Sequence, residues 1–290
     1  MKMQEKCLPC VVNQAIKVAD MVGMKEKGNL LRRVFSYLSK VDYNAITSPE
    51  LIGKIFSIIK EETGNQDPYK ETRQKYNKMF LERLPAYEKE IEQSKKPFEE
   101  AVKYAIIGNV IDFNPIHELT ILDVERHFKR LKGENLEIND ASLLQKELET
   151  AKTILYLGDN CGEICLDKIL LRKIKAMNPK VQIFFATRGA AVVNDSIEED
   201  AYLVGIDEVA TVVSNGDSSL GTVLSRTSKE FLQIYEKADV VIAKGQANYE
   251  CLSTEKKNIY FLLMTKCQVI AKDIGAPEMK MILKRSDAYS

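Results

Sequence analysis

Hydrophobic residues change their spacing near residue 150 of this chain. Up to about Lys152 they recur at intervals of three and four residues, which is the pattern of amphipathic helices. The pattern predicts helices over residues 11–22, 27–39, 48–62, 69–94, 96–107, 116–130 and 141–150. Ser48 before Pro49, and Asp67 before Pro68, are typical of helix starts.

After Lys152, short β-rich runs alternate with helical stretches. The expected strands cover residues 153–157, 181–186, 209–213, 240–243 and 259–263, with helices at 163–177, 195–204 and 220–237. This alternation predicts a parallel sheet with right-handed crossovers, and the apolar runs indicate strands covered on both faces. The predicted fold is α/β, with a Rossmann-like, mostly parallel sheet flanked by helices. An N-terminal all-helical domain (residues 1–150) would precede the α/β domain (residues 151–290).

Composition and charge narrow the class of protein. The 290 residues include 42 basic and 42 acidic side chains and six cysteines. The balanced charge gives no support for a long-range electrostatic attraction to a nucleic-acid polymer or an anionic membrane, although it allows a local basic pocket. No apolar run reaches the roughly 18–20 residues of a membrane span, and the polar start MKMQEKCLPCVV does not resemble a signal peptide. We therefore expect a cytoplasmic protein with unpaired cysteines, whose oligomeric state the sequence leaves open.

Polar turns follow the first two expected strands. Gly158-Asp159-Asn160-Cys161-Gly162-Glu163 follows residues 153–157, and Asn194-Asp195 closes the loop that begins at Arg188-Gly189. The carboxyl ends of adjacent parallel strands open onto one crevice, so these turns should face one another across roughly 5 Å. Carboxylate and amide oxygens of Asp159, Asn160 and Asp195 suit Mg²⁺ or Mn²⁺. Taken alone, each turn could merely cap the helix that follows it.

Basic residues follow two further strands on the same expected edge. Lys244 begins the segment Lys-Gly-Gln-Ala-Asn-Tyr-Glu after residues 240–243, and Lys266 follows residues 259–263. With Arg188, they could neutralise the charge of a phosphate. Each could also be only an ion pair or the polar end of a strand. The glycines and hydroxyls of residues 214–222 could add N–H donors. A combined phosphate and metal site accounts for all five polar loops.

Other chemistries have weaker support. Cys7-x-x-Cys10 has the spacing of a zinc knuckle, but a structural zinc site needs four ligands. Cys161 and Cys165 could complete such a set only if the N-terminus packs over the sheet edge; a redox pair or inert thiols are the other options. His117 and His127 lie on expected helices without partners, which disfavours a Ser-His-Asp triad. No glycine fingerprint for a dinucleotide follows the first strand.

Taken together, the motifs resemble those of the metal-dependent damage-control phosphatases, a family long catalogued only as a domain of unknown function. These motifs are GDNxGE at 158–163, RG…ND at 188–195, KGQxNYE at 244–250 and KC at 266–267. The resemblance extends to Asp67-Pro68-Tyr69 and Gly108-Asn109-x-x-Asp112, and Cys7-x-x-Cys10 resembles a mark of the archaeal and bacterial subfamily. It implies a sheet domain with an appended helical domain and phosphatase activity that depends on cobalt, nickel, manganese or magnesium.

The resemblance also assigns roles to residues. It implies that Asp159, Asn160 and Asp195 hold the metal, and we expect them to be catalytic. The residues expected to bind substrate or phosphate are Glu163, Arg188, Asn194, Lys244, Gln246, Asn248, Glu250 and Lys266. Apart from the resemblance, the spacing of Cys7 and Cys10 allows a redox pair or a second metal site, with inert thiols as the leading interpretation. The expected reaction is hydrolysis of a small phosphorylated metabolite, such as a sugar phosphate or a damaged nucleotide, by a metal-activated water. The alternative is a non-catalytic sensor or carrier of a phosphorylated ligand.

Overall fold

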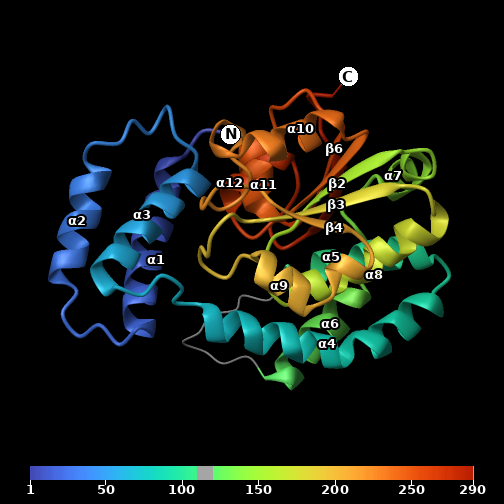
Figure 1. Ribbon diagram of the computed structural model, residues 1–290, viewed down its shortest axis with the longest axis horizontal. Coiled ribbons are helices and arrows are strands. Elements are labelled where there is room, and N and C mark those ends of the chain that lie inside the picture. The colour runs from blue at the N-terminus through green and yellow to red at the C-terminus, as the bar shows by residue number, and fades with distance from the viewer. Residues whose placement is uncertain (110–119, 290) are drawn as a thin grey trace.

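A single sheet organises the described part of the chain (Figure 1). It has seven strands in the order β1-β7-β6-β5-β2-β3-β4. The computed structural model describes residues 1–109 and 120–289. The strands are β1 (Ile138–Asn139), β2 (Thr153–Leu157), β3 (Gln182–Thr187), β4 (Thr211–Ser214), β5 (Val240–Lys244), β6 (Ile259–Met264) and β7 (Met281–Arg285). Neighbouring strands are parallel except β6 and β7, which are antiparallel. The predicted α/β fold with a mostly parallel sheet is therefore confirmed.

The sheet contains two strands that the sequence pattern did not predict. β1 has only two residues, too few for a detectable alternation. β7 reads MILKR, in which two basic residues follow the apolar run, so it lacks the uniform apolar pattern of the other strands. It pairs antiparallel to β6 through Tyr260↔Arg285 and Met264↔Met281. The five expected strands are present, each within two residues of the expected bounds.

Ten helices of the described chain lie in segments expected to be helical, whereas residues 245–252 and 268–274 form two helices that were not predicted. The helices are α1 (Leu8–Met21), α2 (Gly28–Leu38), α3 (Ser48–Thr63), α4 (Lys70–Glu92), α5 (Pro97–Gly108), α6 (Ile121–Lys132), α7 (Ala141–Leu148), α8 (Glu163–Met177), α9 (Glu198–Leu203), α10 (Lys229–Lys237), α11 (Gly245–Leu252) and α12 (Gln268–Ile274). The expected helix 220–237 begins late, because Ser228 caps α10 by accepting from the Phe231 N–H at 3.1 Å. The expected helix 116–130 begins at Ile121 after a Thr120 capping box, and residues 116–119 lie outside the described residues.

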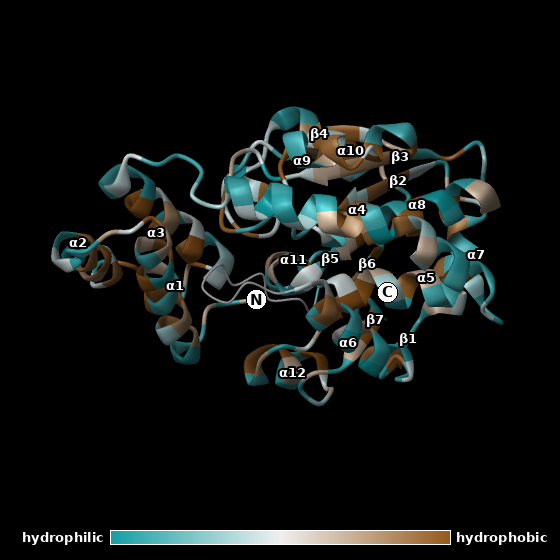
Figure 2. Ribbon diagram, turned by 90° about the horizontal axis from the view of Figure 1, so that it is seen from below, coloured by the Kyte–Doolittle hydropathy of each residue, from teal (hydrophilic) through white to brown (hydrophobic). Residues whose placement is uncertain are grey.

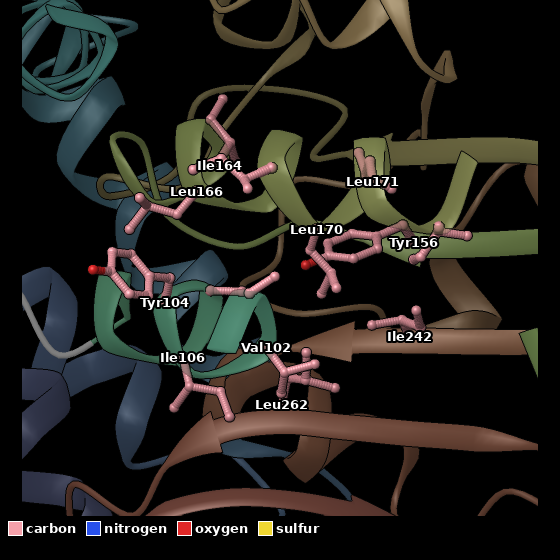
Figure 3. Close-up of a cluster of buried hydrophobic side chains, with 14 of the residues drawn as sticks. Val102, Tyr104, Ile106, Tyr156, Ile164, Leu166, Leu170, Leu171, Ile242 and Leu262 are labelled. Carbon is pink, nitrogen blue, oxygen red and sulfur yellow. The ribbon is translucent and has the colours of Figure 1, made fainter. Parts of the chain in front are cut away.

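Alternating side chains of the strands pack into two separate apolar layers, one on each face of the sheet. Along β2, Ile154 and Tyr156 point to the layer covered by α4–α8, whereas Leu155 and Leu157 point to the layer covered by α10–α12. Figure 3 shows the first layer, where Val102 of α5 and α8 side chains pack around Tyr156, Ile242 and Leu262. Because both faces are buried, the polar groups at the strand ends are left as the positions where the sheet can meet a ligand.

Helices α1–α3 form a bundle with an apolar core of their own, set beside the sheet (Figures 1 and 2). Tyr69 and Val192 join that core, while α4 and all later helices of the described chain contribute to the two sheet layers. The division into domains at residue 150 stays a prediction, whereas the packing of apolar side chains changes partner near Tyr69. No helix within residues 1–109 and 120–289 is both long and apolar enough to cross a membrane.

Candidate active site

The order of the strands places a crevice at the carboxyl end of β2. The chain runs from β2 to β3 on one side and later returns to β5 on the other side of β2. Connections on the two sides diverge at such a point, so the strand ends leave a space that α/β proteins use for ligands. Three segments meet there: the turn after β2, the turn after β3 and the start of α11. They contain the sequence motifs GDNxGE, RG…ND and KGQxNYE.

The turns after β2 and β3 are hydrogen-bonded to one another. Asn160 and Asp195 form an antiparallel β-bridge. The Ser196 N–H donates to the Asp159 carbonyl at 2.8 Å, and the Cys161 N–H donates to the Asn194 carbonyl at 2.9 Å. The expectation that Asp159 and Asn160 face Asp195 across one strand spacing is therefore confirmed. The backbone, not only the side chains, holds the two carboxylates together.

Arg188 lies between these two carboxylates. Its Nε donates to Asp195 Oδ2 at 2.6 Å, and its Nη2 lies 3.4 Å from Asp159 Oδ1. The side chain is 2% exposed, so the guanidinium meets protein oxygens and not solvent. A planar fork of donors suits this position, because it can orient two carboxylates at once.

Two amides complete the ring of polar groups around Asp159. The Asn160 Nδ2 donates to Asp159 Oδ2 at 2.9 Å and to Glu163 Oε2 at 3.0 Å. The Asn109 Nδ2, from the end of α5, donates to the same two oxygens at 2.7 and 3.0 Å. Asn109 Oδ1 is buried and has no hydrogen-bond partner among residues 1–109 and 120–289. Asn109 belongs to a segment of the family resemblance, but no local pattern predicted that it lies beside Asp159.

A fully buried ion cluster lies beneath these groups. Lys244 Nζ is 2.5 Å from Glu163 Oε1 and 2.5 Å from Asp167 Oδ1, and it donates to the Ala105 carbonyl at 2.9 Å. The Tyr156 hydroxyl donates to Asp167 at 2.7 Å. Lys244 was expected to contact phosphate, but all of these contacts are internal. Asp167 was not expected to belong to the site, although two acids four residues apart within an apolar helical run are a detectable signal.

The buried charges of the cluster do not balance. Four carboxylates (Asp159, Glu163, Asp167 and Asp195) meet two buried cations (Arg188 and Lys244), which leaves a formal charge of −2 when all are ionised. Burial, and then the charges of Asp195 and Glu163, raise the pKa of Asp159 well above its usual range, while Arg188 and Lys266 oppose this. Burial likewise raises the pKa of Asp195 against the effect of Arg188, and it raises the pKa of Asp167 to about 7.

A divalent cation fits this arrangement. It would offset the excess negative charge, and hard oxygen donors from carboxylates and amides are the ligands that Mg²⁺ and Mn²⁺ prefer. The unpartnered Oδ1 of Asn109 is one more such donor. In the described part of the chain no three His, Cys, Asp or Glu side chains are arranged to hold a metal. A metal at this site would therefore need amide oxygens in addition to Asp159 and Asp195.

Gly245, the first residue of α11, makes close contact with Asp159. Its φ is +77°, and a Cβ atom built there would lie 1.9 Å from Asp159 Oδ2. Any side chain would therefore displace the carboxylate, in addition to the strain of the left-handed conformation. The glycine in the KGQxNYE segment is thus needed for the start of α11 to approach the turn after β2.

A cavity of about 370 Å³ opens in front of the two carboxylates. The expected site residues that line it are Asp159, Asn160, Asn194, Asp195, Gln246, Glu250, Lys266, Cys7 and Cys10. Four other expected residues (Glu163, Arg188, Lys244 and Asn248) lie behind this lining. The α1–α3 bundle contributes Ser48 and Ile52 to the opposite wall. The sequence did not identify this wall.

Gln246 and Asn248 of the KGQxNYE segment make different structural contacts. Gln246 Oε1 accepts from the Lys266 N–H at 2.5 Å, which ties α11 to the loop after β6. Asn248 accepts from the Thr222 hydroxyl at 2.8 Å and donates to the Lys244 carbonyl at 2.7 Å. Asn248 therefore holds loops together from a buried position. Burial raises the pKa of Glu250 to about 7.

The cysteines do not form the four-ligand site considered above. Cys161 and Cys165 are fully buried, and Cys165 contacts the Asn77 carbonyl instead of another thiol. Cys7 and Cys10 line the cavity, Cys10 being exposed. Since no cluster of three metal-binding side chains exists in residues 1–109 and 120–289, the Cys₄ option is wrong for the described residues. A redox role for Cys7 and Cys10 stays a prediction.

Comparisons with known proteins identify the family of this chain. Residues 3–282 match the family described as "Damage-control phosphatase ARMT1-like domain". The chain belongs to the damage-control phosphatase family. It is 33% identical to a damage-control phosphatase of Pyrococcus horikoshii, over 99% of both chains. It is also 33% identical to a damage-control phosphatase of Archaeoglobus fulgidus, over 98% of this chain and 99% of that one.

A solved member of this family has the same fold. The crystal structure of a DUF89 family protein from Pyrococcus horikoshii superposes with a TM-score of 0.88 at 32% sequence identity. The match covers 99% of this chain and 100% of that one. The damage-control phosphatase fold in this chain therefore includes both the sheet and the α1–α3 bundle.

Proposed function

We propose that this protein is a metal-dependent phosphatase that hydrolyses phosphomonoesters of small metabolites, in the manner of metabolite damage control. The observation that carries the proposal is the pair Asp159 and Asp195, held side by side by backbone hydrogen bonds at the mouth of a cavity, with excess negative charge around them. The names of the two archaeal relatives support a phosphatase. The cavity volume of about 370 Å³ suits a compact substrate.

Asp159, Asn160 and Asp195 would hold the divalent cation, with the unpartnered Asn109 Oδ1 as a further donor. The candidate ions are Mn²⁺, Ni²⁺, Co²⁺ and Mg²⁺. Such an ion supplies Lewis-acid stabilisation of phosphoryl charge and acidifies water. Arg188 keeps Asp195 in one orientation through its bond at 2.6 Å. Glu163 accepts from both amides and so keeps their side chains directed at the site.

The phosphoryl group would lie between the carboxylates and Lys266, which lines the cavity and remains exposed. Lys266 and the backbone beside it offset the charge on the phosphoryl oxygens. A carboxylate oxygen of Asp159 or Asp195 takes the proton of the attacking water. The bond between phosphorus and the ester oxygen breaks as the bond to the water oxygen forms. The proton held by the carboxyl then passes to the leaving oxygen, so the products are phosphate and the alcohol of the metabolite.

The test is hydrolysis of p-nitrophenyl phosphate and of a panel of sugar phosphates, first with EDTA and then with each of the four metals. We expect activity that EDTA abolishes and that added metal restores. Asp159→Ala should abolish turnover with the fold intact by circular dichroism, while the exposed Asp207→Ala serves as the matched control. Metal-stimulated turnover that persists in Asp159→Ala would contradict the assignment.

The second candidate function is a sensor or carrier of a phosphorylated ligand. The observation in its favour is that, among the described residues, no three His, Cys, Asp or Glu side chains are arranged to hold a metal for hydrolysis. Saturable binding of a sugar phosphate with no hydrolysis under any of the four metals would favour this function over the phosphatase.

A further inference from the structure

A buried polar network lies behind the candidate active site, on the side of α4 and α9. Its members are Arg73 and Asn77 of α4, Asp200 of α9 and Asp67, which precedes α4. Arg73, Asn77 and Asp200 are at most 2% exposed. None of the four lines the cavity. Buried polar groups are stable only when they are hydrogen-bonded. The hydrogen bonds of these residues connect them to the candidate active site.

The network is continuous from Asp67 to the turn after β2. Arg73 binds Asp67 through two parallel hydrogen bonds of 2.6 and 2.8 Å, and its Nε donates to Asp200 Oδ2 at 2.7 Å. Asn77 Nδ2 donates to Asp200 Oδ1 at 2.9 Å, and Asn77 Oδ1 accepts from the Gly162 N–H at 2.6 Å. An amide with the opposite orientation would lose both of the last two bonds, so the network fixes the orientation of Asn77.

Both turns that carry candidate metal ligands end on this network. Gly162 has a φ of +71° and lies between Asn160 and Glu163, so the bond from its N–H to Asn77 holds the turn in an unusual conformation. Asp200 Oδ2 also accepts from the Ile197 N–H at 3.0 Å, two residues after Asp195. One carboxylate and one amide therefore restrain both turns from behind.

The far end of the network meets the link that follows α3, the helix whose first turns form the opposite wall of the cavity. Asp67 lies in the link between α3 and α4, and α3 contributes Ser48 and Ile52 to that wall. The link is short, because α3 ends at Thr63 and α4 begins at Lys70. A bidentate bond from Arg73 to Asp67 thus anchors the bundle to the same residues that restrain the metal-binding turns.

We propose that Arg73, Asn77 and Asp200 are positioning residues that set the geometry of the metal site, and that Asp67 extends their effect to the wall formed by the bundle. The proposal rests on the proposed function, since it assumes that the two turns hold a metal. It predicts different consequences at the two ends. Substitution of Asn77 should weaken metal binding. Substitution of Asp67 should alter substrate binding and leave the metal affinity unchanged.

The first measurement is the Mn²⁺ dissociation constant of the wild type, Asn77→Ala and Asp200→Asn by isothermal titration calorimetry. Outer-shell partners of metal ligands are worth about 10–100-fold in affinity, and we expect a loss in that range for Asn77→Ala. Asn77→Asp keeps an oxygen for the Gly162 N–H but places a second carboxylate against Asp200, so the two acids repel and its Mn²⁺ affinity should also fall below that of the wild type. In Asp67→Asn we expect a raised KM, with kcat and the Mn²⁺ affinity within twofold of the wild type.

The matched control is Leu84→Ala, which removes a buried apolar side chain from α4 and leaves the network intact. It should lower the melting temperature and not the Mn²⁺ affinity. If Asn77→Ala fails to fold, Asn77→Asp and Asp200→Asn decide the question. Affinities within twofold of the wild type in both of them, with lowered melting temperatures, would overturn the proposal. A wild type that neither binds Mn²⁺ nor hydrolyses phosphate esters would instead refute the proposed function.

Discussion

Arg188 Nε donates to Asp195 Oδ2 across 2.6 Å, and both side chains are about 2% exposed. The arginine therefore acts on the carboxylate from behind, while the cavity lies on the other side of Asp195. This arrangement differs from a phosphate-binding arginine, which would direct its fork into the cavity. Orienting a carboxylate and binding phosphate directly would have different effects on kcat and KM when Arg188 is replaced.

Replacing Arg188 by Lys keeps the charge and removes the fork of donors. If Arg188 only orients carboxylates, kcat and metal affinity should fall by about 10-fold or more with KM nearly unchanged. The measurement is steady-state kinetics on a sugar phosphate together with Mn²⁺ titration. Arg33→Lys, in an exposed ion pair with Glu61 and Glu62, is the control. A raised KM with unchanged kcat would instead indicate direct binding of phosphate.

Asp159→Asn should stabilise the metal-free protein. The pKa of Asp159 is raised by burial and by Asp195 and Glu163, so ionisation of this carboxyl at neutral pH costs folding free energy that a neutral amide does not. We expect a melting temperature a few degrees above that of the wild type in EDTA. With Mn²⁺ at 100 times its dissociation constant, the wild type should gain about 2.7 kcal/mol, and the variant should not. A lower melting temperature of the variant in EDTA would contradict the charge imbalance.

Lys244→Met tests the buried ion cluster. Its removal leaves Glu163 and Asp167 without their shared cation, a change that costs about 3–5 kcal/mol when a buried pair is broken. Urea unfolding at pH 7.5 should show this loss, and the exposed Lys237→Met should not. If Lys244 serves phosphate instead, stability will be unchanged and KM will rise.

Glu250 gives a pH dependence of known sign. Burial raises the pKa of this carboxyl from its ordinary 4.5 to about 7, so the folded state holds a proton that the unfolded state has lost between these two values. The contribution of Glu250 to stability is therefore greatest below pH 4.5 and declines as pH rises towards 7.

Glu250→Gln should flatten that slope and stabilise the protein by about 1 kcal/mol at pH 8, since partial exposure reduces the effect. Urea unfolding at pH 5 and pH 8 measures both values, with the exposed Glu236→Gln as control. An unchanged slope in Glu250→Gln would show that another group titrates.

Local patterns in the sequence predicted the two carboxylate turns correctly because both follow apolar strands, and parallel strand ends share one edge. They did not predict Asn109, Asn77 or Arg73, because these residues reach the site from α4 and α5 through packing that periodicity does not encode. No local pattern could predict that the Lys244 side chain points into the protein and not into the cavity. It depends on α5 covering the sheet and offering the Ala105 carbonyl to the buried ammonium group.

The separate apolar core of α1–α3 has a consequence for engineering. Ser48 and Ile52 belong to a unit whose folding contacts are largely its own, whereas the two acidic turns are braced by the sheet and by α4. Grafting this three-helix unit from a relative, with the Asp67 link retained, should exchange substrate preference while the hydrolytic chemistry is preserved. Under the proposed function, selectivity and reactivity would then be encoded in different parts of the chain.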